Sequence, residues 1–427
     1  MIFGKKKEKA LLEKFENQEL NQSYWAIVKR QFRKNRIAVW SLRFLLVIFL
    51  VALFGDFIAN EKPIYCKIND KTYFPIFKQY AVDIGLDHWK ADFFQKEWNE
   101  HDYEKVIFPP IPFSSTTIDR GYTNFAEPQE RHWLGTDQLG RDVAAGMVSG
   151  TRTAMLVGVV AMSIAAIIGI FFGALGGYFG DERFQISRIR LVLNIIGVGL
   201  GYLYAFKFRT YQLTNSDANF GFEILKSCFI FFAILLLLNL LANALKRISS
   251  LGKKVTIPID IIIMRFIEVI NSIPILLILL SVIAMLQKPS IFHVMIIIGI
   301  LRWTGIARFI RAELLRVRSL NYVEAAQAMG FSEWRIILRH AIPNALTPVL
   351  IAIAFGVASA ILLEAFISFL IPFDSQITWG SLLREAREAH TAWWLAIFPG
   401  LAIFITVTLF NLIGEGLTDA LDPKLRE

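Results

Sequence analysis

Long runs of apolar residues constrain this chain more than any other feature. The first run, WSLRFLLVIFLVALFGDFIA at residues 40–59, is about as long as an α-helix that crosses the roughly 30 Å hydrocarbon core of a bilayer. Of the 427 residues, 55% are hydrophobic, whereas a soluble domain averages about 45–50% even with glycine counted. Because the excess lies in the runs, the sequence predicts an all-α polytopic membrane protein.

Basic residues beside the runs predict the orientation of the chain. The N-terminal segment 1–39 is rich in lysine and arginine, and short basic segments next to a span remain in the cytoplasm. Eight predicted crossings then place both termini in the cytoplasm. The net charge of +9 is interpreted as basic edges of membrane spans, which argues against a nucleic-acid partner.

The predicted organisation has five parts. Residues 1–39 form a cytoplasmic N-terminal segment, and residues 40–59 form the first transmembrane helix. Residues 60–145 form an extracytoplasmic segment that is too long and too aromatic for a plain linker, so we expect it to be at least partly folded. Residues 146–414 form the remaining transmembrane domain, and residues 415–427 form a cytoplasmic tail.

Residues 321–344 are the longest polar stretch between apolar runs in the C-terminal half. The first part is rich in the helix formers Ala, Glu, Gln and Met. Gly330 follows directly, and a glycine in the left-handed conformation commonly ends a helix. The stretch therefore predicts a helix–glycine–helix hairpin between two spans, which a basic preceding segment places in the cytoplasm.

The second helix of this hairpin carries apolar residues at helical spacing. They are expected to form one apolar stripe and are Trp334, Ile337, Leu338 and Ala341. Pro343 is expected to stop the helix, because proline lacks an amide hydrogen and clashes with the preceding turn. On physical grounds alone, a surface linker between spans explains these residues equally well.

The hairpin resembles the EAA loop of permease subunits of ATP-binding-cassette (ABC) importers. The resemblance is carried by Glu324-Ala325-Ala326, then Gly330, then Ile342-Pro343, and the flanking YVEAA, WRII and HAIPNA sequences are similar to the oligopeptide/dipeptide branch. In that family the loop docks into a groove on the ATP-hydrolysing subunit. The residues that the resemblance assigns to ATPase coupling are Glu324, Ala325, Ala326, Gly330, Arg335, Arg339 and Pro343.

A second stretch, HWLGTDQLGRDV from residue 132, resembles the GTDxLGRD signature of the same family. Gly135 and Gly140 permit tight turns. Arg141 can form ion pairs with Asp137 and Asp142 that fix the entry into the next span. We interpret this signature as structural, with no catalytic role.

The C-terminal sequence NLIGEGLTDALDPKLRE resembles the end of the family's permeases. The matching residues, interpreted as structural, are Asp419, Asp422 and Pro423. Thr418 stands where the family usually has arginine, which argues against a required charge at that position.

Two segments depart from the oligopeptide pattern. Residues 60–131, with the strings YFPIFKQY and PPIPFS, resemble permeases of microcin C/oligopeptide importers. Two further apolar stretches, 191–206 and 222–245, predict an inserted transmembrane hairpin at 191–245, which raises the six spans of a type I importer permease to eight. The alternative is a re-entrant or interfacial pair, because the first stretch is short for a span.

Two carboxylates fall in or next to apolar runs, where an unpaired charge is costly. Glu268 has Arg265 three residues earlier, on the same helix face. Glu364 either serves transport or ties its helix to a neighbour.

The resemblance implies a permease subunit of a bacterial inner-membrane importer for oligopeptides or peptide-like compounds. Its implied partners are a second permease in a heterodimer, two ATPase subunits, an extracytoplasmic substrate-binding protein and the surrounding lipid. The chain is expected to hold no metal or other cofactor, and ATP is expected on the partner subunits, because no GxxxxGK[ST] motif occurs here.

Two other classes of membrane protein would use these carboxylates differently. A membrane enzyme would use Glu268, Glu364 and His390, but the sequence contains no HExxH or GxSxG motif. An ion-coupled secondary transporter would use Glu364 as a proton relay, and internal inverted repeats would favour it. The sequence shows no such repeats.

Overall fold

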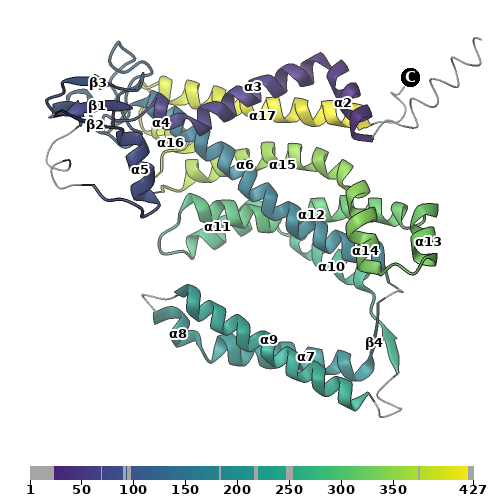
Figure 1. Cartoon of the computed structure of the whole chain (residues 1–427). Helices are drawn as coiled ribbons and strands as arrows, with labels where there is room; N and C mark the ends of the chain where they lie inside the picture. Colours follow the sequence, from purple (N-terminus) through teal and green to yellow (C-terminus); the bar gives the residue numbers. More distant parts are fainter. Residues whose placement is uncertain are drawn as a thin grey trace, which may run out of the picture. The chain divides into compact units, whose positions relative to one another are not determined.

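The computed structural model describes residues 24–68, 70–89, 93, 98–181, 184–215, 220–246, 253–373 and 376–421. Long helices dominate it, and the chain forms two compact units (Figure 1). We call residues up to 173 and from 269 the main unit, and residues 174–268 the hairpin unit.

The predicted polytopic helical fold is confirmed. Seven helices in the described part of the chain are long and apolar enough to cross a membrane, and an eighth span results if one bent helix pair is counted. The seven are Arg36–Leu53, Val143–Phe179, Arg188–Lys207, Gly221–Leu245, Ile291–Val317, Pro348–Leu370 and Trp394–Leu421. The bent pair is α10 (Ile259–Ser272) and α11 (Ile275–Ala284), which meet at 76° beside Pro274, where the sequence predicts a kink.

The core of the main unit lies between α6, α11, α12 and α15. These helices span Val143–Ala174, Ile275–Ala284, Ile291–Val317 and Ile342–Leu370. Their shared apolar cluster includes Val157, Leu279, Met295, Ile298 and Leu363. Glycines on α6 bring α12 close: a Cβ atom at Gly173 would lie 2.6 Å from the Ala307 carbonyl oxygen. Such close contacts are typical of helix packing in lipid.

The first span packs against the last one. It is helix α3 (Arg36–Leu53), which follows α2 (Tyr24–Lys34) and precedes the short α4 (Gly55–Ile58). It begins before the predicted residue 40 because the Asn35 side chain caps it, accepting the Ala38 amide at 3.1 Å. Asn35 also donates to Asp419 on α17 (Trp394–Leu421) at 3.2 Å.

The segment between α4 and α6 is folded where the structure describes it. It contains a small antiparallel sheet in the order β2-β1-β3, which adds strands to the predicted all-α fold. The strands are β1 (Tyr65–Ile68), β2 (Lys71–Tyr73) and β3 (Lys105–Ile107), and the helical elements are α5 (Pro75–Asp83), η2 (Trp98–Glu100) and η3 (Arg120–Tyr122). Figure 1 shows this segment at one end of the main unit and the 321–344 stretch at the other.

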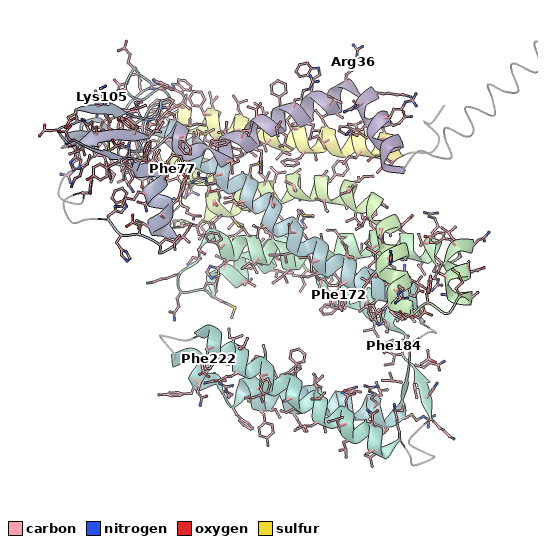
Figure 2. All side chains as sticks on the ribbon, viewed as in Figure 1. Arg36, Phe77, Lys105, Phe172, Phe184 and Phe222 are labelled. Carbon is pink, nitrogen blue, oxygen red and sulfur yellow. The ribbon has the colours of Figure 1, made fainter. Side chains whose placement is uncertain are left out.

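The hairpin unit consists of two long helices joined by a short one. Its elements are η4 (Leu175–Phe179), β4 (Gln185–Ser187), α7 (Arg188–Tyr202), η5 (Leu203–Lys207), α8 (Thr210–Asn215), α9 (Phe220–Leu245), β5 (Lys254–Thr256) and most of α10. Gly197 of α7 faces Leu235 and Leu238 of α9. Strands β4 and β5 pair antiparallel at the base of the hairpin. Side chains project outward along α9, with Phe222 near one end (Figure 2).

The helix formed by the first inserted stretch is longer than its apolar run. Together α7 and η5 form a helix of 20 residues, Arg188–Lys207, which is long enough to cross a bilayer. A full crossing by both helices of the hairpin stays a prediction.

Candidate functional site

The 321–344 stretch contains the predicted helix–glycine–helix arrangement. Helix α13 (Asn321–Ala328) is terminated by Gly330, two residues after its last residue. The φ of Gly330 is +79°, in the left-handed region. The Gly330 amide donates to Gln327 at 2.9 Å, and the Phe331 amide donates to Ala326 at 3.2 Å. This pair of hydrogen bonds defines a Schellman motif, in which the left-handed residue is usually glycine.

The prediction that Pro343 stops the second helix is wrong. Helix α14 (Glu333–Ile336) continues through a π-helical turn, η6 (Ile337–Ala341), directly into the long α15. Pro343 lies just after the π turn, where it removes one backbone donor from the helical run without ending it. Figure 1 shows the helical run bending between α14 and α15 without a break in the helix.

The prediction of one apolar stripe on this second helix is also wrong. Ile337 and Ala341 are buried, whereas Trp334 is 55% exposed and Leu338 is 63% exposed. The π turn contributes more residues per turn than an α-helix, so residues spaced for one α-helical face diverge onto two. As a result, apolar side chains remain on the surface of the loop.

The surface of the loop combines exposed apolar and basic side chains. Those that the structure describes as exposed are Tyr322, Met329, Phe331, Trp334, Arg335, Leu338 and Arg339. The Arg335 guanidinium lies 5.7 Å from the centre of the Phe331 ring. Aromatic residues, methionine and arginine are the types enriched in protein–protein interfaces.

The loop is attached to the main unit by its other face. Val323, Ala326 and Ile336 are buried, while Glu324 and Ala325 are exposed. Of the three EAA residues, one therefore anchors the loop and two face outward.

The GTDxLGRD signature forms a buried charge cluster at the opposite end of the main unit. Arg141 contacts Asp137 and donates to Glu385 of α16 (Trp379–Glu388) at 2.8 Å. Asp137 also accepts the backbone amides of Leu139 and Arg141, each at 2.9 Å. The cluster therefore joins the signature turn to a helix far along the sequence.

The two signature glycines occupy left-handed positions. Gly135 has φ +77° and Gly140 has φ +88°. A Cβ atom at Gly135 would lie 2.8 Å from the Ala126 carbonyl oxygen, so a side chain is excluded as well as strained there.

Asp142 does not pair with Arg141, in contrast to the prediction. Its carboxylate lies 2.8 Å from Nδ1 of His132, and it accepts the Ala145 amide at 2.7 Å at the start of α6. His132 is fully buried, and its Nε2 lies 3.5 Å from Asp119. The His132 ring and the Ala145 amide hold the Asp142 carboxylate in place. A carboxylate is favourable at the start of a helix because it accepts hydrogen bonds from backbone amides that have no helical partner.

Glu385 is the least compensated member of the charge cluster. Burial raises its pKa to about 7, the negative charge of Asp137 adds to the effect, and Arg141 opposes it. One carboxylate oxygen of Glu385 is buried without a hydrogen-bond partner in the described part of the chain.

The stability of the folded chain is expected to decrease as the pH rises from about 4.5 to about 7. The raised pKa means that folded Glu385 holds its proton more tightly than the unfolded chain does, so ionisation costs stability, on the order of 3 kcal/mol. Glu385→Gln keeps an acceptor for Arg141 and is expected to flatten this pH dependence. The measurement is tryptophan-fluorescence melting of the purified protein between pH 5 and 8. Glu127→Gln, at an exposed position before the signature, is the control. An unchanged profile in Glu385→Gln would refute the assignment.

The intramembrane carboxylates predicted from the sequence have different surroundings. Glu268 lies 2.7 Å from Arg265, at the expected spacing, and both side chains are more than half exposed. Glu364 is buried in α15, accepts the Ser368 hydroxyl at 2.6 Å and interacts with Thr378, the N-cap of α16. Asp422 and Pro423 lie outside the described residues.

Within the described ranges, no group of three or more His, Cys, Asp or Glu is placed to hold a metal ion.

The packed apolar helices and the hairpin-shaped loop between two of them define a multi-pass α-helical membrane protein. The family model described as "Binding-protein-dependent transport system inner membrane component" matches residues 248–427. The model described as "N-terminal TM domain of oligopeptide transport permease C" matches residues 23–75. The two matches support a C-type permease subunit of an oligopeptide or dipeptide ABC transporter, and the apolar helices fit a multi-pass inner-membrane protein.

Curated relatives extend the similarity to nearly the whole chain. The "Inner membrane ABC transporter permease protein YejE" of Escherichia coli is 29% identical over 95% of this chain and 97% of its own length. The "Peptidoglycan transport system permease protein YejE" of Agrobacterium fabrum is 26% identical over 92% of both chains. The "Dipeptide transport system permease protein DppC" of Bacillus subtilis is 28% identical over 70% of this chain and 71% of its own. These matches fit the permease interpretation and do not support an ion-coupled secondary transporter.

Proposed function

We propose that this chain forms half of the transmembrane pathway of an ABC importer for peptides or peptide-like compounds. The relatives are named for dipeptide, oligopeptide and peptidoglycan transport, which supports this class of substrate. In this proposal the chain pairs with a second permease and receives its substrate from an external binding protein. Two further subunits bind and hydrolyse ATP.

The observation that carries the proposal is the outward-facing surface of the 321–344 loop. Exposed apolar and basic side chains, with Trp334 and Leu338 the most prominent on α14 and η6, are presented on a turn fixed by Gly330. The loop also lies within the region matched by the family model. We infer that an ATPase subunit covers this surface, with Glu324 and Ala325 exposed on the first helix and Arg335 and Arg339 on the second helical run.

The helical continuity of the loop supplies a route for coupling. Because α14 runs through η6 into α15 without interruption, a displacement of the docked surface is passed directly to a membrane span. The buried Val323 and Ile336 hold the loop to the main unit, so the loop moves with the spans. Closure of the ATPase dimer would thus move α15, which fits alternating access by rigid-body motion.

The proposed orientation places the loop and both termini in the cytoplasm. The signature cluster and the segment after the first span then lie outside, where the binding protein docks. This orientation is supported by the basic segments that flank the spans and by the separation of the two features at opposite ends of the main unit (Figure 1).

Co-purification with transport in vesicles tests the proposal. A tagged chain extracted from its native membrane is expected to bring down a second permease and an ATPase. Vesicles containing that complex are expected to accumulate peptide when ATP and the binding protein are supplied, and a protonophore should leave the rate unchanged. Isolation of the chain alone, or uptake that collapses with the protonophore, would contradict it.

A further inference from the structure

Arg302 is a cationic side chain inside an apolar helix, and it has no acidic partner among the residues that the structure describes. Arg302 is located near the middle of α12, which packs against α6 and α15 in the main unit. The guanidinium Nη2 donates to the hydroxyl of Ser359 on α15. The Nε atom is buried and has no hydrogen-bond partner, and no acidic side chain in the described residues forms an ion pair with Arg302.

A neutral hydroxyl does not neutralise an arginine, which stays charged under all physiological conditions. The chain does pair arginine elsewhere: Arg152 of α6 forms hydrogen bonds of 3.1 and 2.8 Å with both carboxylate oxygens of Asp56. This fold can therefore place a carboxylate beside an arginine of a span, as it does for Arg152. A charge kept in a span at this cost marks a pathway for ions or substrates.

The surroundings of Arg302 are partly open. Arg302 is itself half-buried, whereas Ile298, one turn before it, is fully buried in the core. Gly305, one turn after Arg302 on the same helix face, is exposed, and a Cβ atom there would meet nothing within 4 Å. The Arg302 side chain therefore lies at the edge of the core, with its Nε atom covered and the neighbouring helix surface at Gly305 open.

We propose that Arg302 binds the C-terminal carboxylate of the peptide during its passage through the membrane. This inference rests on the proposed import of peptides. A carboxylate accepts charge-assisted hydrogen bonds from a cationic side chain, and such bonds are roughly twice as strong as those between neutral groups. A position near the middle of a span lies far from the lipid head groups, so a substrate carboxylate is favoured over a lipid phosphate.

Defined peptides provide the test, each prepared with a free carboxylate and as the C-terminal amide. Uptake into vesicles holding the complete complex is compared between wild type and Arg302→Gln for each form. The variant and the wild type are compared with the same peptide form, so any preference of the binding protein for one form cancels from the ratio of their uptake rates. We expect uptake of the carboxylate form to fall roughly tenfold or more, as for loss of a charge-assisted hydrogen-bond pair, and uptake of the amide to stay within about twofold.

Three further variants separate a binding role from a packing role. Arg302→Lys keeps the charge and is expected to retain most of the carboxylate preference. Ser359→Ala removes only the neutral partner and is expected to change neither form. Arg308→Gln, an exposed arginine further along α12, is the matched control. If Arg302→Gln assembles poorly, Arg302→Lys and Ser359→Ala still report the preference in intact complexes.

The remaining outcomes overturn the proposal in distinguishable ways. An equal fall for both peptide forms would assign Arg302 to a structural charge pair with the second permease. Unchanged uptake of both forms would remove Arg302 from the pathway, while the import function stands. If wild-type complex transports neither form with ATP and binding protein present, the import function itself fails, and this inference fails with it.

Discussion

Replacing Gly330 with aspartate is expected to abolish most ATP-driven uptake while the chain still inserts and folds. The residue has φ +79°, and a non-glycine residue there costs about 1–2 kcal/mol. No atom lies within 4 Å of a Cβ at this position, so the change disturbs the turn and its charge without a clash in the main unit. A shift of that size lowers the population of the docking-competent turn by about tenfold. The measurements are peptide uptake in vesicles and retention of the ATPase during purification.

Two comparisons isolate the cause. Gly330→Asn has the same shape without the charge and tolerates the left-handed region better than most residues, so it should retain more uptake. Gly85 also has φ +79° and open space at its Cβ position, but lies in the segment after the first span. Gly85→Asp is therefore expected to leave coupling intact. Wild-type uptake by Gly330→Asp would remove the loop from the coupling mechanism.

Above pH 7, where Glu385 is ionised in the wild type, Arg141→Ala is expected to destabilise the folded chain by about 3–5 kcal/mol, because it leaves a buried carboxylate without its cation. Asp137 keeps two backbone donors after the change, so Glu385 suffers most. The destabilisation should appear as a lower melting temperature in detergent and a lower yield of assembled complex.

Arg131 supplies the matched control for this prediction. It is 53% exposed and pairs with Asp119 at 2.7 Å, so Arg131→Ala is expected to cost less than about 1 kcal/mol. The double variant Arg141→Ala with Glu385→Gln should recover part of the lost stability, because it removes the bare carboxylate. Equal melting temperatures for Arg141→Ala and Arg131→Ala would show that the buried cluster stabilises the fold no more than an exposed ion pair does.

Features governed by local periodicity or local turn chemistry could be predicted from the sequence. The apolar runs correspond to the helices that can cross a membrane, because runs of this length have no other stable location. The kink at Pro274 and the turn at Gly330 each depend on one residue with an unusual backbone, and both are present. The first inserted stretch looked short because its helix begins at Arg188, three residues before the apolar run that the sequence shows from 191.

Features that depend on long-range contacts or on a change of helical period could not be predicted. Arg141 meets Glu385 across 244 positions of sequence, and nothing local to either residue announces the other. His132 lies just before the signature, and this position was a signal that it belongs to the same cluster. Its pairing with Asp142 could be seen only in the folded turn. The π turn at Ile337–Ala341 moved Trp334 and Leu338 to the surface, since period-based reasoning assumes one helix type throughout. Arg302 lies within an apolar run, and the sequence alone does not distinguish it from the basic residues at the end of that span.

Strands β4 and β5 make the inserted hairpin a separable module. Gln185 faces Thr256 and Ser187 faces Lys254, so the chain enters and leaves the insertion at neighbouring points. Insertions whose ends meet are tolerated because the flanking chain needs no rearrangement. An ancestral permease could therefore have gained the hairpin in a single genetic event, and a shortened gene that joins the two strands by a tight turn would encode a smaller transporter of the same family.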